Sequence, residues 1–289
     1  MSSQTRLLII SGLSGSGKSV ALHVLEDLGY YCIDNMPAAL LKSVVNEVMQ
    51  QEEHPEVRVA VGVDARNREG DLKALPSLIE DLQRDDVTTE LLFLQADDEV
   101  LLKRFSETRR RHPLAEPGTE LRQAIELERN LLGPVINAAD LIIDTTHTSV
   151  YELAEAIRDR VDRRSANTLS VLIESFGFKH GIPADADFVF DLRCLPNPYW
   201  ETSLRSKTGL DTEVAEFLDQ QPQFSQMYDD ILQFLSRWIP QYVGFDRSYL
   251  TVAIGCTGGQ HRSVHMAEKL TAALKKIHDP VLTRHKELP

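Results

Sequence analysis

The chain has 289 residues, enough for one large or two ordinary domains, and its 42% hydrophobic and 26% charged residues are typical of water-soluble globular proteins. The formal net charge of −13 excludes a uniformly basic nucleic-acid surface but not a local basic patch. No apolar stretch approaches the roughly 18 residues of a membrane span. The three cysteines are too few and too widely spaced for a disulfide framework or a zinc site. We therefore expect a reduced, cytoplasmic protein without membrane contact.

A glycine-rich segment follows the first apolar run, at 7–10, and matches the P-loop pattern G-x-x-x-x-G-K-[ST] with Gly12, Leu13, Ser14, Gly15, Ser16, Gly17, Lys18 and Ser19. In such a loop backbone N–H groups surround phosphate oxygens, Lys18 reaches the β- and γ-phosphates, and the Ser19 hydroxyl is a ligand for Mg²⁺. The helix expected over 20–28 directs its positive end toward the same anion. A glycine-rich turn that binds nothing is the alternative. The segment predicts a nucleoside triphosphate site.

Short apolar runs alternate with helical stretches from residue 1 to about 160, which predicts βαβ units and a parallel sheet. Strands are expected at 7–11, 30–33, 57–63, 91–94 and 141–143. Four of them lead into an acidic residue: Asp34, Asp64, Asp97 and Asp144. Because the carboxyl ends of parallel strands share one edge of a sheet, we expect these carboxylates to gather near the P-loop.

Asp64 ends an apolar strand and has the position of a Walker B aspartate, which holds Mg²⁺ directly or through water. With Lys18 and Ser19 it completes the set of candidate catalytic residues. It also opens a tetrad whose polar groups are suited to read a base or phosphates: Asp64, Ala65, Arg66 and Asn67. An aspartate that caps the following loop is the simpler alternative for Asp64. For Asp34, Asp97 and Asp144 that alternative is at least as well supported.

A helix expected over 99–111 carries four arginines, Arg104, Arg109, Arg110 and Arg111. A strand, an aspartate and then such a helix are the layout of small-molecule kinases, in which arginines clamp the transferred phosphoryl group. The layout supports an alternative function, a small-molecule kinase with a fused phosphate-sensing domain. Arg104 and Arg111 are seven residues apart and are expected to share a helix face. A solvated helix end before Pro113 explains the arginines equally well.

The apolar periodicity lapses around 161–168, so we place a domain boundary there and expect domains at 1–163 and 169–289. In the second half we expect strands at 169–173 and 187–193 and amphipathic helices at 212–219 and 224–238. The last 29 residues carry six Lys or Arg against three acids. This excess suits an RNA backbone, although a solvated helix face is the more economical explanation.

A second glycine-bearing turn follows an apolar strand that begins at Tyr249, and a helix is expected from about Arg262. N–H groups at a helix start, together with a guanidinium, form an anion cradle. The candidate effector phosphate-binding residues are Asp191, Arg193, Thr257, Gly258, Gly259, His261, Arg262 and Ser263. Cys256 and Arg262 also have the C-x5-R spacing of cysteine-dependent phosphatases. A phosphate-binding loop is favoured over a phosphatase, because Gly255 replaces the usual histidine, and over a purely structural turn.

Five segments occur together and in order: 12–19, Asp-Asn-Met-Pro at 34–37, Asp-Ala-Arg-Asn at 64–67, Glu-Ser-Phe-Gly-Phe-Lys-His-Gly-Ile-Pro at 174–183 and Gly-Cys-Thr-Gly-Gly-Gln-His-Arg-Ser at 255–263. In these segments the chain resembles the RapZ/YvcJ family of bacterial P-loop nucleotide-binding proteins over essentially its whole length. The resemblance implies a kinase-like P-loop domain with weak ATPase and GTPase activity, ATP at the P-loop, GTP at the 64–67 tetrad, and Mg²⁺. It also implies a smaller α/β C-terminal domain that senses the amino-sugar phosphate glucosamine-6-phosphate.

The same resemblance implies an RNase adapter, which binds small regulatory RNAs, presents one to an endoribonuclease and forms a homo-oligomer, described as a tetramer. Two departures bear on this expectation. The family's basic C-terminal stretch is shortened here to the residues at 284–289, and each lost phosphate contact reduces RNA affinity at physiological salt. Tyr199 stands where a histidine is expected near the sugar-phosphate pocket, and a tyrosine donates a hydrogen bond but carries no positive charge.

Overall fold

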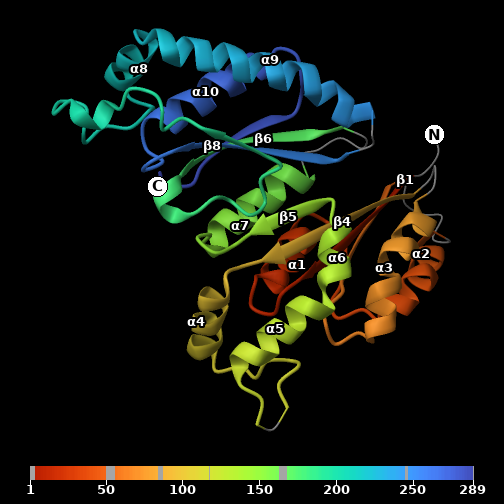
Figure 1. Cartoon of the computed structure of the whole chain (residues 1–289). Helices are drawn as coiled ribbons and strands as arrows, with labels where there is room; N and C mark the ends of the chain where they lie inside the picture. The colour runs from red at the N-terminus through yellow and green to blue at the C-terminus, as the bar shows by residue number, and fades with distance from the viewer. Residues whose placement is uncertain are drawn as a thin grey trace. The chain divides into compact units, whose positions relative to one another are not determined.

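The computed structural model describes residues 4–49, 56–83, 87–116, 118–162, 168–244 and 247–288. The chain divides into two compact units, residues 1–163 and 164–289 (Figure 1). Each unit contains one parallel sheet with helices, so the predicted fold class, a P-loop α/β domain followed by a smaller α/β domain, is confirmed. The boundary expected around 161–168 falls largely on 163–167, which lie outside the described residues. None of the described helices is long and apolar enough to cross a membrane.

The first sheet has the strand order β2-β3-β1-β4-β5, and every pairing in it is parallel. Its strands are β1 (Gln4–Gly12), β2 (Tyr31–Ile33), β3 (Glu56–Gly62), β4 (Val87–Gln95) and β5 (Leu141–Asp144). The helices of this unit are α1 (Lys18–Asp27), α2 (Leu41–Met49), α3 (Glu69–Leu82), α4 (Asp98–Thr108), α5 (Leu121–Leu131), α6 (Gly133–Asn137) and α7 (Val150–Ile157). A 3-10 helix, η1 (Ala38–Leu40), and a π-helical turn, η2 (Arg158–Asp162), complete it.

The central strand β1 is apolar on both faces, as expected for a parallel strand covered by helices on both sides. Leu7 and Ile9 belong to a core that also contains apolar residues of α2, α3 and α6. Leu8 and Ile10 are equally buried and point to the opposite face, because successive side chains of a strand alternate. On the unit's other helical layer α1 contacts α7 (Figure 1). The carboxyl end of β1 is thereby held at the middle of the sheet edge, where the P-loop begins.

The helix that carries the arginines is shorter than predicted. α4 ends at Thr108, and Arg109 takes the left-handed conformation with φ 51° while its N–H donates to the Phe105 carbonyl at 2.9 Å. The expectation that Arg104 and Arg111 share a helix face is therefore wrong. The helix stops because the chain turns to bury His112, which is only 2% exposed.

The second sheet has the order β7-β8-β6-β9 and is also parallel throughout. Its strands are β6 (Ser170–Gly177), β7 (Phe188–Asp191), β8 (Tyr249–Cys256) and β9 (Val281–His285). Its helices are α8 (Thr212–Asp219), α9 (Pro222–Gly244) and α10 (Arg262–Leu274), with 3-10 turns η3 (Phe178–His180) and η4 (Pro198–Trp200). α10 packs on β6, β8 and α9 around one apolar core (Figure 1).

Two elements of the second unit differ from expectation. β7 ends at Asp191, so Arg193 lies in the following turn and not in a strand. The C-terminal segment contains β9, which pairs with β6, whereas the sequence favoured a solvated helix face for its basic residues and predicted no strand there. The Lys286 N–H continues this pairing by donating to the Ser175 carbonyl at 3.1 Å.

Candidate functional site

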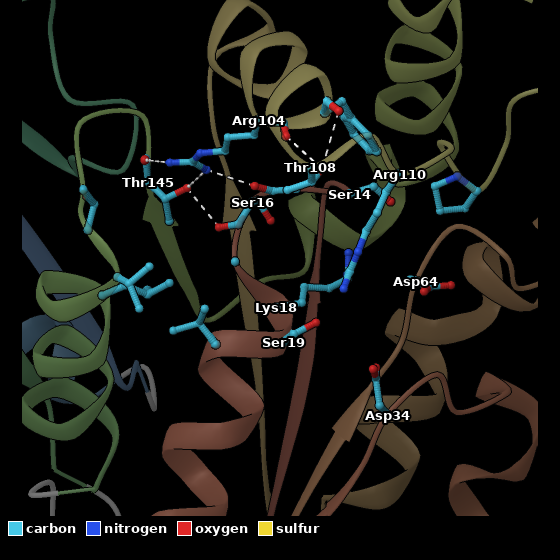
Figure 2. Close-up of a pocket in the computed structure, with 18 of the residues that line it drawn as sticks. Ser14, Ser16, Lys18, Ser19, Asp34, Asp64, Arg104, Thr108, Arg110 and Thr145 are labelled. Carbon is cyan, nitrogen blue, oxygen red and sulfur yellow. Dashed lines mark hydrogen bonds between the residues drawn. The ribbon is translucent and has the colours of Figure 1, made fainter.

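A cavity of about 740 Å³ opens beside the P-loop at the carboxyl edge of the first sheet. The P-loop residues 14–19 line it, together with Val20, Asp34, Asp64, Arg66, Arg104, Phe105, Thr108, Arg110, Arg111, Pro113, Thr145, Thr148, Ser149, Val150 and Leu153. Figure 2 shows that Lys18, Ser19, Asp34 and Asp64 lie around the same space. The structure therefore brings together the three candidate catalytic residues, Lys18, Ser19 and Asp64.

The glycines of the P-loop are required by its backbone. Gly12, Gly15 and Gly17 have φ values of 143°, 88° and 110°, in a region that other residues rarely adopt. A Cβ atom on Gly12 would lie 2.2 Å from the Leu94 carbonyl oxygen. The Leu13 N–H donates to that same oxygen at 3.0 Å. Gly12 and Leu13 thus fasten the loop to β4, whereas the residues from Ser14 onward face the cavity.

Lys18 is half-buried, and its ammonium donates to the Gly12 carbonyl at 2.6 Å, across the curve of the loop. Burial lowers the pKa of Lys18 from its usual value, although the carboxylates of Glu128, Asp64 and Asp34 oppose this shift. These carboxylates are the counter-charges of the lysine in the P-loop domain. A phosphate group that enters the loop would add negative charge beside an ammonium that is already partly desolvated.

A buried glutamate of α5 holds the P-loop by hydrogen bonds. We did not predict this role from the sequence. Glu128 of α5 accepts the Ser14 N–H at 2.8 Å and the Ser14 hydroxyl at 2.7 Å. The Leu114 N–H donates to Nδ1 of His112, so Nε2 of this histidine carries the proton and donates to Glu128 at 3.1 Å. One signal was available: Glu128 occupies the apolar stripe that α5 forms with Ala124 and Ile125.

The carboxylate of Glu128 is ionised in this arrangement. Burial opposes its charged form, but hydrogen bonds from His112 and Ser14 and the positive charge of Lys18 together hold the pKa of Glu128 below its ordinary value. Its side chain and that of His112 have no exposed surface. A charge buried so completely fixes the loop strongly, because moving Ser14 away would leave the carboxylate without its donors.

Arg104 lines the cavity, but its guanidinium group makes hydrogen bonds to backbone carbonyls of the P-loop and of a neighbouring segment. Its Nη1 donates to the carbonyl of Gly15 at 3.0 Å and its Nη2 to the carbonyl of Thr145 at 2.6 Å (Figure 2). The Thr145 hydroxyl in turn donates to the Ser16 carbonyl at 2.9 Å. These contacts satisfy carbonyl groups of the loop and thereby hold its backbone in shape.

The 64–67 tetrad is divided between the cavity and the interior. Asp64 and Arg66 line the cavity and pair with each other, with Nε of Arg66 donating to Asp64 at 3.0 Å. Burial raises the pKa of Asp64, but hydrogen bonds and charge from Arg66 outweigh it and leave that pKa below its ordinary value. Ala65 is buried in the core. The amide of Asn67 accepts the Ala38 N–H at 2.7 Å and donates to the Met36 carbonyl at 3.2 Å.

Of the other strand-end aspartates, only Asp34 lines this cavity. Its carboxylate accepts the N–H of Asn35 at 2.7 Å. Asp144 is the last residue of β5 and its carboxylate accepts the N–H of Thr146 at 2.8 Å, as the capping alternative proposed, whereas Asp97 precedes α4 but its side chain makes no capping hydrogen bond to that helix. The sequence left the roles of all three aspartates open, and of the three the structure places Asp34 in the wall of the P-loop cavity.

The oxygen atoms in the cavity fit Mg²⁺. The Ser19 hydroxyl and the carboxylates of Asp34 and Asp64 are hard oxygen ligands, and Mg²⁺ in nucleotide sites takes one or two carboxylates and completes its shell with phosphates and water. Within the part of the chain that the structure describes, no group of three His, Cys, Asp or Glu could hold a metal by itself. The donor set therefore suits an ion that arrives with a nucleotide.

The second unit has a cavity of about 500 Å³ between the segment after β7 and the start of α10. Its lining residues are Arg193, Cys194, Leu195, Pro196, Asn197, Trp200, Gln223, Thr257 and Arg262. Three of the predicted effector residues, Arg193, Thr257 and Arg262, thus face one space. Asn197 and Trp200 also line it, and no signal in the sequence pointed to them.

Arg262 is the first residue of α10 and is 3% exposed. Its Nη1 donates to the Leu195 carbonyl at 2.7 Å, and its Nη2 lies 3.3 Å from the Thr257 hydroxyl. Its Nε is buried and makes no hydrogen bond within the described residues. The guanidinium group therefore ties the segment after β7 to the loop after β8 and retains one unsatisfied N–H.

The other predicted effector residues of the loop after β8 contact neighbouring segments of the second unit and do not line the cavity. A Cβ on Gly259 would lie 2.7 Å from the Gly177 nitrogen, which explains a glycine with φ 75° at this position. Gly258 packs against Gly177. Nε2 of His261 lies 3.3 Å from the Leu204 carbonyl, and the Ser263 hydroxyl lies 3.2 Å from the sulfur of Cys256.

Cys256, the possible phosphatase nucleophile, is 2% exposed and does not line the cavity. Burial raises the pKa of its thiol, but hydrogen bonds from Ser263 and Gly259 and the charge of Arg262 bring that pKa below its ordinary value. The geometry lacks the accessible sulfur that attack on phosphorus requires.

Asp191 and Arg193 form a pair with each other. Nη2 of Arg193 donates to Asp191 at 2.7 Å, and the guanidinium group lies 3.8 Å from the ring centre of Phe178. The hydrogen bond from Arg193 lowers the pKa of Asp191. Arg193 reaches the cavity through this stack, whereas Asp191 holds Arg193 and does not line the cavity itself.

Both halves of the chain match family models built from known proteins. Residues 5–165 match the RapZ-like N-terminal domain and residues 169–289 the RapZ C-terminal domain. A nucleotide-binding protein of Hahella chejuensis is 50% identical over 98% of this chain and 99% of its own length, and one of Methylococcus capsulatus is 50% identical over 98% and 96%. A solved shikimate kinase of Bacteroides thetaiotaomicron is 15% identical, with a TM-score of 0.36 over 54% of this chain and 98% of that one. The chain belongs to the RapZ family.

Proposed function

We propose that this protein is a nucleotide-dependent regulator that binds ATP or GTP with Mg²⁺ in the P-loop cavity and hydrolyses it slowly. The observation that carries the proposal is the convergence of Lys18, Ser19, Asp34 and Asp64 on one cavity at the carboxyl edge of a parallel sheet. Relatives named nucleotide-binding proteins, 50% identical over nearly the whole chain, support it. We assign both nucleotides to the P-loop, and not GTP to the 64–67 tetrad, because Ala65 is buried in the core and Asn67 hydrogen-bonds to backbone groups of the protein.

When bound, Mg²⁺ would be held by the Ser19 hydroxyl and by Asp34 or Asp64, and it would neutralise charge on the β- and γ-phosphates. Lys18 would exchange its hydrogen bond with the Gly12 carbonyl for phosphate oxygens. The N–H groups of the loop would orient the triphosphate, while Glu128 and Arg104 keep the loop in shape.

The test is release of inorganic phosphate from ATP and from GTP by the purified protein, with and without Mg²⁺. Lys18→Ala should reduce hydrolysis at least about 100-fold, because the lysine contacts the group on which charge develops. Lys103→Ala, which removes an exposed lysine of α4 outside the cavity, is the matched control. Full activity of Lys18→Ala would overturn the assignment. Phosphate transfer from labelled ATP to a metabolite would instead support the small-molecule kinase.

We propose that the cavity beside α10 binds an amino-sugar phosphate such as glucosamine-6-phosphate. The supporting features are the N-terminus of α10, the buried guanidinium of Arg262 with its unsatisfied Nε, and the neighbouring Arg193 and Thr257. Calorimetry with glucosamine-6-phosphate, glucose-6-phosphate and glucosamine tests separately whether the amino group and the phosphate group of the ligand contribute to binding. Equal, weak binding of all three would contradict a phosphate-specific site.

We further propose that the protein is a cytoplasmic, homo-oligomeric RNase adapter that presents a small regulatory RNA to an endoribonuclease. Lys275 and Lys276 are exposed and support RNA contact. Arg284 and Lys286 lie 3.8 and 3.9 Å from the fully buried Glu174 and are expected to contribute less. RNA binding across a salt series, with and without the sugar phosphate, tests the adapter role, and sedimentation gives the oligomeric state. Binding that ignores both salt and RNA structure would count against it.

A further inference from the structure

The four arginines around the end of α4 differ in the contacts that they make. Arg104 donates to loop carbonyls, as described above, and Arg111 donates to the Ala115 carbonyl at 2.6 Å. Arg109 ends the helix in a left-handed conformation. Only Arg110 of the four combines a place in the cavity wall with no hydrogen-bond or ion-pair partner among the described residues.

Arg110 faces the P-loop across the cavity. Figure 2 shows its side chain pointing into the cavity, toward Lys18. Two cationic side chains that point into one space repel each other unless an anion lies between them. The P-loop already supplies N–H groups for the inner phosphates. The anion that both cations can reach is therefore the terminal phosphate of a triphosphate held in the loop.

The position of Arg110 is fixed on both sides. Before it, Arg109 turns the chain sharply out of α4. Two residues after it, His112 is buried and hydrogen-bonded to Glu128, which holds Ser14 of the P-loop. The ring of His112 also packs on Phe105, with ring centres 5.1 Å apart. The segment that carries Arg110 is thus joined to the loop it faces through two buried side chains.

We propose that Arg110 is a catalytic residue that contacts the γ-phosphate and stabilises the charge that develops on it during hydrolysis. The inference rests on the proposed function of the P-loop cavity. In the step, the oxygen of a water forms a bond to the γ-phosphorus, and the bond from that phosphorus to the β,γ-bridging oxygen breaks. The electron pair of that bond remains on the nucleoside diphosphate, and the water gives up a proton to solvent. Arg110 donates N–H groups to the γ-phosphate oxygens throughout.

The decisive variants are Arg110→Ala and Arg110→Lys, with Lys103→Ala as the control that removes one exposed cation from the same region. Arg110→Ala should lower kcat for ATP or GTP hydrolysis about 100-fold or more and leave the affinity for the diphosphate nearly unchanged. Arg110→Lys should restore part of the rate, because it keeps the charge but loses the two-pronged donor geometry. Lys103→Ala should behave like the unmodified protein.

A second readout does not depend on turnover. The ratio of affinities for a non-hydrolysable triphosphate and for the diphosphate should fall in Arg110→Ala, because only the triphosphate reaches this side chain. An unchanged ratio together with an unchanged kcat would overturn the role of Arg110 while leaving the P-loop assignment intact. If the unmodified protein binds neither nucleotide, the proposed function itself fails, and the role of Arg110 falls with it. Titration of both ligands separates these outcomes.

Discussion

Ser14 in the P-loop gives both its backbone N–H and its hydroxyl to the carboxylate of Glu128, which lies 114 residues further along the chain. The loop is therefore shaped by a buried ionised side chain as well as by its own glycines. His112 donates a third hydrogen bond to that carboxylate, at the same Oε2 that accepts the Ser14 N–H. The network joins the phosphate loop to the segment that carries Arg110, so stability and catalysis are expected to depend on the same few contacts.

Removal of the buried carboxylate should destabilise the first unit. Glu128→Ala leaves the Ser14 N–H and hydroxyl and the His112 N–H without their acceptor, and we expect a loss of about 3 to 5 kcal/mol in the free energy of unfolding. Glu126→Ala, at an exposed position of the same helix, is the control and should change stability by less than about 0.5 kcal/mol. Urea denaturation followed by circular dichroism measures both. Equal effects in the two variants would refute the anchor.

The pKa of Glu128 predicts how stability responds to acid. Its folded-state pKa lies below the ordinary value of 4.5, so its contribution is complete above that value and is lost as the pH falls through the folded pKa. Glu128→Gln should therefore flatten the fall in unfolding free energy below about pH 4.5. Glu126→Gln should retain the original slope. Denaturant titrations from pH 7 to pH 3 provide the comparison, and parallel curves for all three proteins would contradict it.

Two glycines allow a matched test of the P-loop backbone. Gly12→Ala places a Cβ 2.2 Å from the Leu94 carbonyl oxygen at a φ of 143°, so we expect nucleotide binding to be lost and stability to fall by at least about 2 kcal/mol. A Cβ on Gly70, in α3, meets no atom within 4 Å. Gly70→Ala should raise stability by about 0.5 to 1 kcal/mol. Thermal melts and nucleotide titrations of the two variants measure these effects. Unchanged stability and nucleotide binding in Gly12→Ala would contradict the prediction.

The basic C-terminal residues should separate into two groups. Neutralising Arg284 and Lys286 together should lower stability by about 2 kcal/mol or more, because both lie near the buried carboxylate of Glu174. Neutralising the exposed Lys275 and Lys276 should leave stability within about 0.5 kcal/mol. If the tail binds RNA, this second pair should also reduce the dependence of affinity on salt. Denaturation and filter binding measure the two effects, and a reversed order would contradict the assignment.

The proposed sugar-phosphate site of the second unit can be tested at Arg262. Arg262→Ala removes the donor to the Leu195 carbonyl and should weaken binding of a sugar phosphate at least about 10-fold, with some loss of stability. Thr257→Val, which keeps the side-chain shape and removes one hydroxyl, should weaken binding less than Arg262→Ala. Calorimetric titration with glucosamine-6-phosphate measures both variants. Undiminished affinity in Arg262→Ala would place the ligand elsewhere.

The sequence by itself determined the P-loop, the parallel sheet of the first unit, the α/β class of the second and the gathering of Lys18, Ser19 and Asp64. Each of these follows from local pattern: glycines where the backbone needs positive φ, apolar runs with the period of buried strands, and polar residues at strand ends that must share a sheet edge. It also indicated the loop before α10 as a second anion cradle.

Only the tertiary structure decided which of the repeated residues line the P-loop cavity. Asp34 joins the cavity while Asp97 and Asp144 do not, and Arg110 faces the P-loop while Arg104 supports it. These outcomes depend on one left-handed residue, Arg109, and on buried contacts between segments far apart in the chain, such as that of Ser14 with Glu128. Local periodicity carries no information about such contacts, because their partners are selected by the packing of the whole unit.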